Sequence, residues 1–255
     1  MTTTAILSAL AEEQQGLIER LHNPRRVQRA GRDFWLGDLH GRGVVLALSR
    51  IGKVAAATTA TTLIEAFRVD RIVFTGVAGG LAEGVMVGDV VVADGFVQHD
   101  MDASPLFPRY QVPLYGRHVF ASDALLNATL LEAITSIDTR SSGHFYQLFP
   151  TKPMKTHYGL IASGDRFVSG ATESQALQIA LRDAGLKPLA VEMEGAAVAQ
   201  VCFDYGVPFA AVRTISDRAD DQAHVDFPKF VKEVASHYAL AIMDGFMRRL
   251  PPVTP

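Results

Sequence analysis

The chain has 255 residues, of which 48% are hydrophobic and 20% are charged, and its formal net charge is −3 at pH 7. A chain of this length and apolar content can bury a large core, and we expect one globular domain over residues 1–255. The nearly balanced charge, the scattered Lys and Arg residues and the single cysteine, Cys202, argue against nucleic-acid binding, an intrachain disulfide and a thiolate-rich zinc site.

The N-terminal segment, Met1 to Leu10, lacks the basic start and long apolar centre of a signal peptide. No apolar run in the sequence approaches the roughly 20 residues that a membrane-spanning helix needs. A single cysteine also suits a reducing compartment. We therefore expect a cytoplasmic protein that makes no contact with membranes.

Segments typical of strands and of helices alternate along the chain. Strands are predicted where β-branched or other apolar residues cluster, at Thr4–Leu7, Val44–Leu48, Ile72–Thr75, Val90–Ala93, Leu160–Ala162 and Phe209–Thr214. Helices are predicted where apolar residues recur at helical spacing, at Glu12–Leu21, Lys53–Phe67, Ser122–Ser136, Glu173–Ala184, Glu194–Tyr205 and Lys229–Arg249. This alternation predicts a single-domain α/β fold, with helices on both sides of a mostly parallel, mixed central β-sheet.

Two segments have no regular pattern, Asp100–Arg117 and Arg140–His157. The first contains Pro105, Pro108 and Pro113. Ordered loops of such length usually carry function or contact a partner. In the rest of the chain, parallel strands are expected to hold ligands beyond their carboxyl ends, so residues that directly follow a strand are the first candidates for a site.

The glycine-rich loop predicted at Thr75–Gly80 follows an apolar strand. Its spacing matches neither the dinucleotide-binding fingerprint nor the P-loop, so neither NAD nor ATP is indicated as a cofactor. From this motif alone, a structural tight turn is as reasonable as a backbone contact to a ligand.

Carboxylates follow several of the predicted strands. Glu192 and Glu194 interrupt an apolar stretch at the entry to a helix, where they could serve a ligand or stabilise the helix N-terminus. Asp217 comes directly after the last strand, and a turn or capping role is its alternative to catalysis. Glu12 and Glu13 follow the first strand, where a solvated first helical turn is the alternative.

Taken together, these segments resemble the 5′-methylthioadenosine/S-adenosylhomocysteine nucleosidases, which have the nucleoside phosphorylase fold. The resemblance spans most of the chain and is carried, in the family's order, by Ala9–Glu13, Ile51–Ala56, Thr75–Leu81, Val87–Val91, Ser163–Phe167, Val191–Glu194, and Ile215–Asp217 with Ala219 and Asp220. It implies hydrolysis of the N-glycosidic bond of an adenine nucleoside, with no cofactor and no metal.

The resemblance also implies catalytic roles. Glu13 would deprotonate the attacking water, with Glu12 a less favoured neighbour. Asp217 would protonate N7 of adenine as the bond to ribose breaks, with Ser216 holding its side chain. Departure of adenine leaves negative charge on the base, and an aspartic acid can neutralise it near neutral pH only when its surroundings raise its pKa.

Substrate contacts are implied in the same way. Glu194 would accept hydrogen bonds from the ribose hydroxyls, Met193 would pack against the sugar, Phe167 would stack on the purine, and the backbone of Val168 would read the adenine edge. Near the sugar, contacts from Val77, Ala78 and Gly79 are expected, with the backbone of Val77 standing in for a serine that relatives often carry. Phe227 and Phe107 are candidates for apolar contact with a 5′-thio group, although core packing is an equal alternative for each.

Arg50 departs from the family pattern, since many relatives have glycine there. An arginine near the sugar could bind phosphate, which keeps a phosphorylase as the alternative activity. Two further alternatives are an adenine nucleoside-binding protein without turnover and a dinucleotide-dependent oxidoreductase. The 5′-substituents that the resemblance allows include methylthio, homocysteinyl and aminofutalosine-type groups.

No catalytic role is expected for several other polar residues. His99, Asp100 and Asp102 lie together, but no second ligand cluster accompanies them, so a metal site is not expected. Lys53 is expected to cap or solvate the start of its helix. Residues Met101–Gly116 depart from the family pattern, in a region that in relatives contacts a second subunit, and a homodimer is expected.

Overall fold

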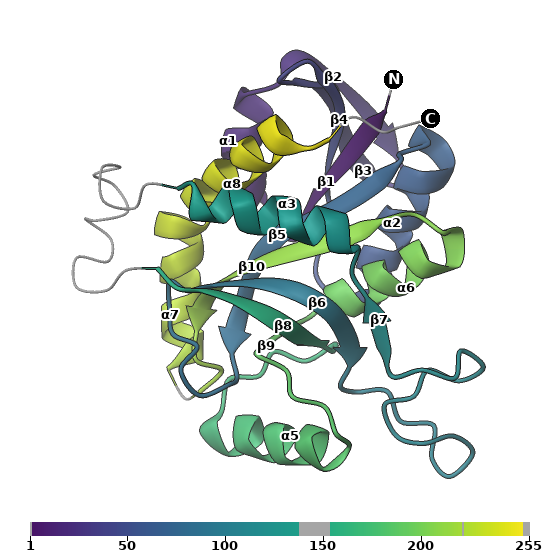
Figure 1. Ribbon diagram of the computed structural model, residues 1–255, viewed down its shortest axis with the longest axis vertical. Coiled ribbons are helices and arrows are strands. Elements are labelled where there is room, and N and C mark those ends of the chain that lie inside the picture. Colours follow the sequence, from purple (N-terminus) through teal and green to yellow (C-terminus); the bar gives the residue numbers. More distant parts are fainter. Residues whose placement is uncertain (1, 138–153, 221, 252–255) are drawn as a thin grey trace.

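The computed structural model describes residues 2–137, 154–220 and 222–251 (Figure 1). Its strands are β1 (Thr3–Ser8), β2 (His22–Arg29), β3 (Arg32–Leu39), β4 (Arg42–Leu48), β5 (Arg71–Gly80), β6 (Val90–Gln98), β7 (Val119–Ala121), β8 (Thr156–Ser163), β9 (Ala190–Glu192) and β10 (Phe209–Asp217). Its helices are α1 (Ala11–Glu19), α2 (Lys53–Phe67), α3 (Ala124–Thr135), α5 (Ala171–Asp183), α6 (Gly195–Tyr205), α7 (Ala223–Phe230), the π-helical turn η1 (Val231–Ala235) and α8 (Ser236–Arg249). Every strand and helix predicted from the sequence is present; the helix predicted at Lys53–Phe67 has the same bounds in the structure, and the others differ at their ends.

All the described strands join one mixed sheet, as the alternating pattern predicts. Among the described residues, five strand pairings are parallel and five are antiparallel. Strand β5 pairs with both β10 and β9, and the path β10–β6–β8–β9 returns to β5, so these five strands close into a ring. From the ring, the sheet continues through β1 and β4 to an outer hairpin formed by β3 and β2. The α/β fold with a mixed central sheet is confirmed.

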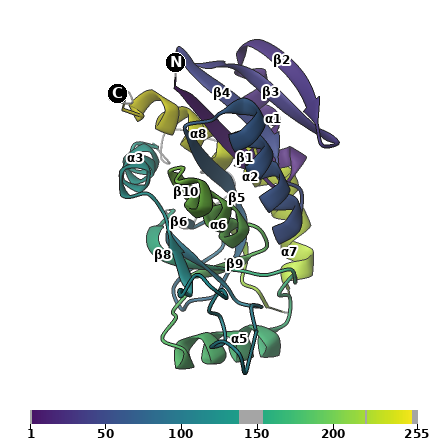
Figure 2. The same ribbon diagram turned by 90° about the vertical axis from the view of Figure 1, so that its right-hand side faces the viewer.

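Helices cover both faces of the sheet (Figures 1 and 2). Helices α2 and α6 pack against each other on one face, over a buried cluster that includes Phe74, Phe96 and Val198. Helices α1, α3 and α8 pack on the other face, over a second cluster that includes Leu46 and Phe246. None of the helices in the described residues is both long and apolar enough to cross a bilayer.

The hairpin of β2 and β3 was not predicted, because both strands are more polar than a buried strand. Strand β2 is almost entirely exposed and forms the edge of the sheet, where polar residues and Pro24 are tolerated. The two-residue turns on either side of β3 place Ala30 and Gly31, and then His40 and Gly41, at positive φ. That pattern is the hairpin turn whose twist matches antiparallel strands.

Other departures from the predicted elements are local. The loop predicted at Thr75–Gly80 is the second half of β5, which stays extended because it pairs with β10 and β9. The short strands β7 and β9 have three residues each, below the length at which a pattern is recognisable. A helix was predicted to start at Lys229, because the preceding Pro228 would usually interrupt a helix. In the structure the helix starts at Ala223, and Pro228 lies inside α7.

One of the two irregular segments is a long loop. Asp100–Arg117 contains no helix or strand apart from an isolated bridge between Val112 and Arg117. Residues 138–153, which make up most of the segment Arg140–His157, lie outside the described residues. Its final residues belong to β8, which begins at Thr156.

Candidate functional site

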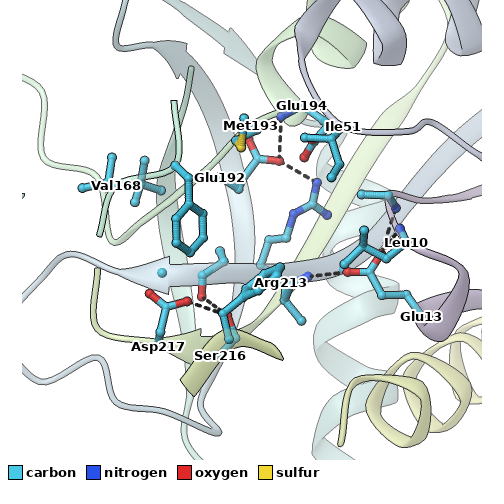
Figure 3. Close-up of a pocket in the computed structure, with 18 of the residues that line it drawn as sticks. Leu10, Glu13, Ile51, Val168, Glu192, Met193, Glu194, Arg213, Ser216 and Asp217 are labelled. Carbon is cyan, nitrogen blue, oxygen red and sulfur yellow. Dashed lines mark hydrogen bonds and ion pairs between the residues drawn. The ribbon is translucent and has the colours of Figure 1, made fainter. Parts of the chain in front are cut away.

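A cavity of about 330 Å³ lies where strands β1, β4, β5, β8, β9 and β10 end, as expected for ligand sites in such sheets. Its lining includes eleven of the site residues proposed from the sequence: Glu13, Val77, Ala78, Gly79, Phe167, Val168, Met193, Glu194, Ser216, Asp217 and Phe227. Figure 3 shows Glu13 and Asp217 on opposite sides of the cavity, with Met193 and Glu194 on a third side. Residues far apart in the chain therefore converge on one space.

Glu13 is held in the first turn of α1, with its carboxylate directed toward β5. Its Oε2 accepts hydrogen bonds from the amides of Ala9 and Leu10, at 2.8 and 3.0 Å, and its Oε1 accepts one from the amide of Val77 at 3.2 Å. A Cβ atom at Gly76 would lie 3.2 Å from Oε1, so glycine allows this close approach. Burial raises the pKa of Glu13 from 4.5 to about 6, although the backbone hydrogen bonds and Arg213 act in the opposite direction.

Asp217 ends β10 and is 1% exposed. Its Oδ2 accepts a hydrogen bond from Oγ of Ser216 at 2.8 Å, and its Oδ1 accepts one from the amide of Ala219 at 2.8 Å. The register of β10 against β5 shifts at this point, so that Asp217 lies opposite Gly79. A Cβ atom at Gly79 would lie 2.9 Å from Oδ1 of Asp217, so a side chain there would displace the carboxylate.

Glu194 occupies the N-cap position of α6, with no capping hydrogen bond from its side chain, and is also buried. Its Oε1 accepts a hydrogen bond from the amide of Gly52, at 2.8 Å, in the turn before α2. Burial and the neighbouring carboxylate of Glu192 raise its pKa to about 8. A neutral carboxyl group can both donate and accept hydrogen bonds, which suits it to a pair of sugar hydroxyls.

A buried ion pair between Glu192 and Arg213 forms the floor between these carboxyl groups (Figure 3). Nη2 of Arg213 lies 2.8 Å from Oε2 of Glu192, and their side chains are 2% and 3% exposed. Nη1 of Arg213 donates to the carbonyls of Phe74 and Val212, and the guanidinium lies 4.1 Å from the centre of the Phe74 ring. Glu192 also accepts hydrogen bonds from Ser163 and from the amide of Gly195.

Arg213 was not predicted from the sequence to be part of the site, and Glu192 was predicted only as a carboxylate that serves a ligand or stabilises the helix N-terminus. Leu10 and Ile51 also line the cavity without having been proposed. Arg213 lies inside a buried strand, and a charged residue there needs a buried counter-charge, which was the signal available in the sequence.

An aromatic pair closes one side of the cavity. The rings of Phe167 and Phe227 meet edge to face, with their centres 5.3 Å apart. Phe167 is 41% exposed, whereas Val168 beside it is buried. A flat ligand could therefore lie against the face of Phe167 while its edge meets the backbone at Val168.

The lesser candidates lie elsewhere. Glu12 is exposed, and neither it, Phe107 nor Arg50 is among the residues that line this cavity. The guanidinium of Arg50 donates to the carbonyl of Gly31 and lines a separate cavity of about 220 Å³ against α1 and β3. Arg50 is thus not placed where a phosphate nucleophile would be needed.

Lys53 and the candidate metal ligands also lie outside the cavity. The side chain of Lys53 was expected to cap or solvate its helix, but it forms an ion pair with Asp100 and donates to Gln98. Among the described residues, no group of three or more His, Cys, Asp or Glu side chains is arranged to hold a metal ion.

The sequence and fold match known proteins over almost the whole chain. Residues 3–248 match the model of the phosphorylase superfamily. The chain belongs to the phosphorylase superfamily. Within it, the resemblance to 5′-methylthioadenosine/S-adenosylhomocysteine nucleosidases is confirmed: the one from Chromohalobacter salexigens is 36% identical over 252 residues, covering 98% of both chains.

Two solved structures from the superfamily match the fold closely. The 5′-methylthioadenosine/S-adenosylhomocysteine nucleosidase of Neisseria meningitidis, in complex with methylthio-immucillin-A, has a TM-score of 0.86 at 33% identity, covering 98% of this chain and 100% of its own. The nucleosidase of the same kind from Colwellia psychrerythraea, in complex with adenine, has a TM-score of 0.86 at 30% identity, covering 98% and 96%.

Proposed function

We propose that this protein hydrolyses the N-glycosidic bond of 5′-methylthioadenosine, S-adenosylhomocysteine or both, releasing adenine and the 5′-thio-ribose product. The observation that carries the proposal is the placement of two buried carboxyl groups, Glu13 and Asp217, on opposite sides of one cavity. An adenine nucleoside between them would present its purine to one and its sugar to the other. The family relatives act on, or bind analogues of, such nucleosides.

The proposed chemistry uses the two carboxyl groups in turn. Asp217 donates its proton to N7 of the departing adenine, and the hydrogen bond from Ser216 holds its side chain in place. Glu13 takes a proton from the water that attacks the anomeric carbon. Charge at the two ends of the breaking bond is thus neutralised from opposite sides, and the protein needs no cofactor for these steps.

Substrate recognition is proposed to follow the lining of the cavity. Glu194 binds the ribose hydroxyls and Met193 packs on the sugar, while the backbone of Val77, Ala78 and Gly79 forms the wall beneath it. On the purine side, Phe167 stacks on the ring and the backbone of Val168 hydrogen-bonds its edge. Phe227, in edge contact with Phe167, is proposed to border the 5′-substituent.

Hydrolysis is favoured over phosphorolysis because the arginines in and near the cavity have other partners. Arg50 lines a different cavity, and Arg166, which lines the nucleoside cavity, pairs with Glu173. Arg213 lines the nucleoside cavity, but its guanidinium is already held by Glu192 and by two backbone carbonyls. A phosphate ion would therefore find a buried carboxylate, Glu13, rather than a free cation, and water is the better nucleophile for this site.

The test is to incubate the purified protein with 5′-methylthioadenosine, with and without inorganic phosphate, and to identify the sugar product. We expect free 5′-methylthioribose at the same rate in both samples. A sugar 1-phosphate formed only with phosphate would establish the phosphorylase alternative instead. Binding of the nucleoside without any product would establish a binding protein.

The pH dependence of the reaction gives a second test, because the pKa of Glu13 is raised to about 6. A base must be ionised, so kcat/KM should fall about tenfold per pH unit as the pH drops below 6. Glu12→Gln, which changes the exposed neighbour, should leave this limb in place. A rate that stays flat down to pH 5 would contradict the role of Glu13, and a limb near pH 8 would assign the required carboxylate to Glu194.

We further propose that the protein is a cytoplasmic homodimer. Support for a dimer comes from segment 100–117, where Leu106 and Leu114 are 83% and 91% exposed. Large apolar side chains exposed together on a loop are typical of a contact with another chain. A single, buried cysteine fits the reducing cytoplasm.

A further inference from the structure

Three charged residues outside the cavity bind one another in a closed cycle. Lys53 is the first residue of α2, Asp100 follows β6, and Asp165 follows β8. The amide of Lys53 donates to Oδ1 of Asp165 at 2.7 Å, and the amide of Asp165 donates to Oδ2 of Asp100 at 2.9 Å. The ammonium group of Lys53 completes the cycle by pairing with Oδ1 of Asp100. We call these three residues the Lys53 clamp.

No member of the Lys53 clamp lines the nucleoside cavity, but its neighbours in the chain do. Gly52, directly before Lys53, donates its amide to Glu194. Phe167 follows Asp165 by two residues. The Lys53 clamp therefore connects the segment that holds the proposed ribose-binding carboxyl group to the segment that carries the proposed purine-stacking ring.

The two segments approach so closely that the position before Lys53 requires glycine. Gly52 has a φ of +95°, which L side chains rarely adopt, and a Cβ atom there would lie 3.2 Å from Oδ1 of Asp165. Glycine at this position therefore lets the side chain of Asp165 reach the amide of Lys53 at the start of α2. Asp100 binds the amide of Asp165 from the other side, so that both the side chain and the backbone of Asp165 are held.

The ammonium group of Lys53 also links the cycle to helix α6. It donates to Oε1 of Gln98 at 3.1 Å, and Nε2 of Gln98 donates to Oε1 of Gln200 in α6 at 2.8 Å. Helix α6 begins directly after Glu194. The Lys53 side chain is only 16% exposed, so water screens this ion pair less than it screens a pair at the surface.

We propose that the Lys53 clamp is a positioning device for nucleoside recognition, which sets the separation between Glu194 and the Phe167–Val168 segment. The proposal rests on the proposed function for the identity of the ligand. The three residues of the Lys53 clamp do not touch the nucleoside and act through Glu194 and Phe167. Because these contacts hold the substrate equally before and during reaction, weakening the Lys53 clamp raises KM and leaves kcat nearly unchanged.

The experiment compares Lys53→Met, which removes the charge and keeps the length of the side chain, with Lys53→Arg, which keeps the charge. For Lys53→Met we expect KM for 5′-methylthioadenosine and the Kd for adenine each to rise about tenfold, equivalent to about 1.4 kcal/mol. Lys53→Arg should restore most of the affinity. Adding Asp100→Asn to Lys53→Met should cost little more, because both changes break the same pair.

Arg26→Met is the matched control, since it removes a cation from an exposed ion pair with Asp33 on the outer hairpin. It should leave KM and the adenine Kd unchanged. If Lys53→Met also leaves both values unchanged, or lowers kcat alone, the positioning role is wrong. Failure of the unaltered protein to hydrolyse 5′-methylthioadenosine would overturn the proposed function only, because the Kd for adenine still reports on the Lys53 clamp.

Discussion

Asp217→Asn is expected to lower kcat for 5′-methylthioadenosine by roughly 10²- to 10⁴-fold, the contribution of one positioned general acid. The amide has the shape of the carboxyl group. Its oxygen can still accept from the amide of Ala219, and its NH₂ group can donate to Oγ of Ser216, so the fold should persist. It has no proton to give to N7 of adenine. Steady-state kinetics together with adenine binding by calorimetry would separate lost chemistry from lost binding.

Asp220→Asn is the matched control for Asp217→Asn. Asp220 lies on the same loop, accepts a hydrogen bond from the amide of Gln222, and does not line the cavity. Its replacement should change kcat by no more than about twofold, as for most substitutions outside a site. If Asp217→Asn retains near-full turnover, Asp217 is not the acid, and another group must protonate the leaving base.

Arg213→Met is expected to cost about 3–5 kcal/mol in the free energy of unfolding, the typical penalty for removing one partner of a buried ion pair. Glu192 would remain buried with no cation beside it, and the carbonyls of Phe74 and Val212 would lose a donor. Urea unfolding with linear extrapolation measures the cost. A decrease in the free energy of unfolding below about 1 kcal/mol, which is typical of an exposed ion pair, would show that the buried pair of Arg213 and Glu192 does not contribute as expected.

Two further variants test whether the loss of stability in Arg213→Met comes from the buried, unpaired charge of Glu192. Arg248→Met breaks an exposed pair with Asp244 one turn away on α8, and it should cost only about 0.3–0.5 kcal/mol. Adding Glu192→Gln to Arg213→Met removes the stranded charge while keeping an acceptor for Ser163 and Gly195. The double variant should therefore be more stable than Arg213→Met alone.

The sequence predicted the proposed site residues better than it predicted their supports. Glu13 and Asp217 lie at or just after the ends of apolar strands, which made them candidates because the carboxyl ends of parallel strands meet at one edge of a sheet. The family resemblance then supplied their grouping and their roles. Arg213 and Glu192 could not be paired in this way, because their contact depends on how β9 and β10 are ordered in the sheet. Likewise, the Lys53 clamp joins segments that follow three different elements, and nothing local to Lys53 indicates Asp100 as its partner.

The strands likewise divide into those that could be predicted from local sequence and those that could not. Strands buried on both faces were recognised from their apolar runs, whereas β2 and β3 are polar because they form the outer hairpin. Their turns offered a signal that composition did not, since Ala30-Gly31 and His40-Gly41 each place a glycine at the second position of a two-residue turn. The short strand β9 could not be seen in the sequence, yet it closes the ring and delivers Glu192 and Glu194 to the cavity.

The closed ring of strands has a consequence for how the protein acquires its cavity. Its lining begins at Ala9 and ends at Phe227, and it draws on strands that pair across most of the sequence. Contacts between such distant residues form late, after much chain entropy has been lost. No short fragment of the polypeptide contains the whole lining. We therefore expect the cavity to form only when the whole sheet has folded.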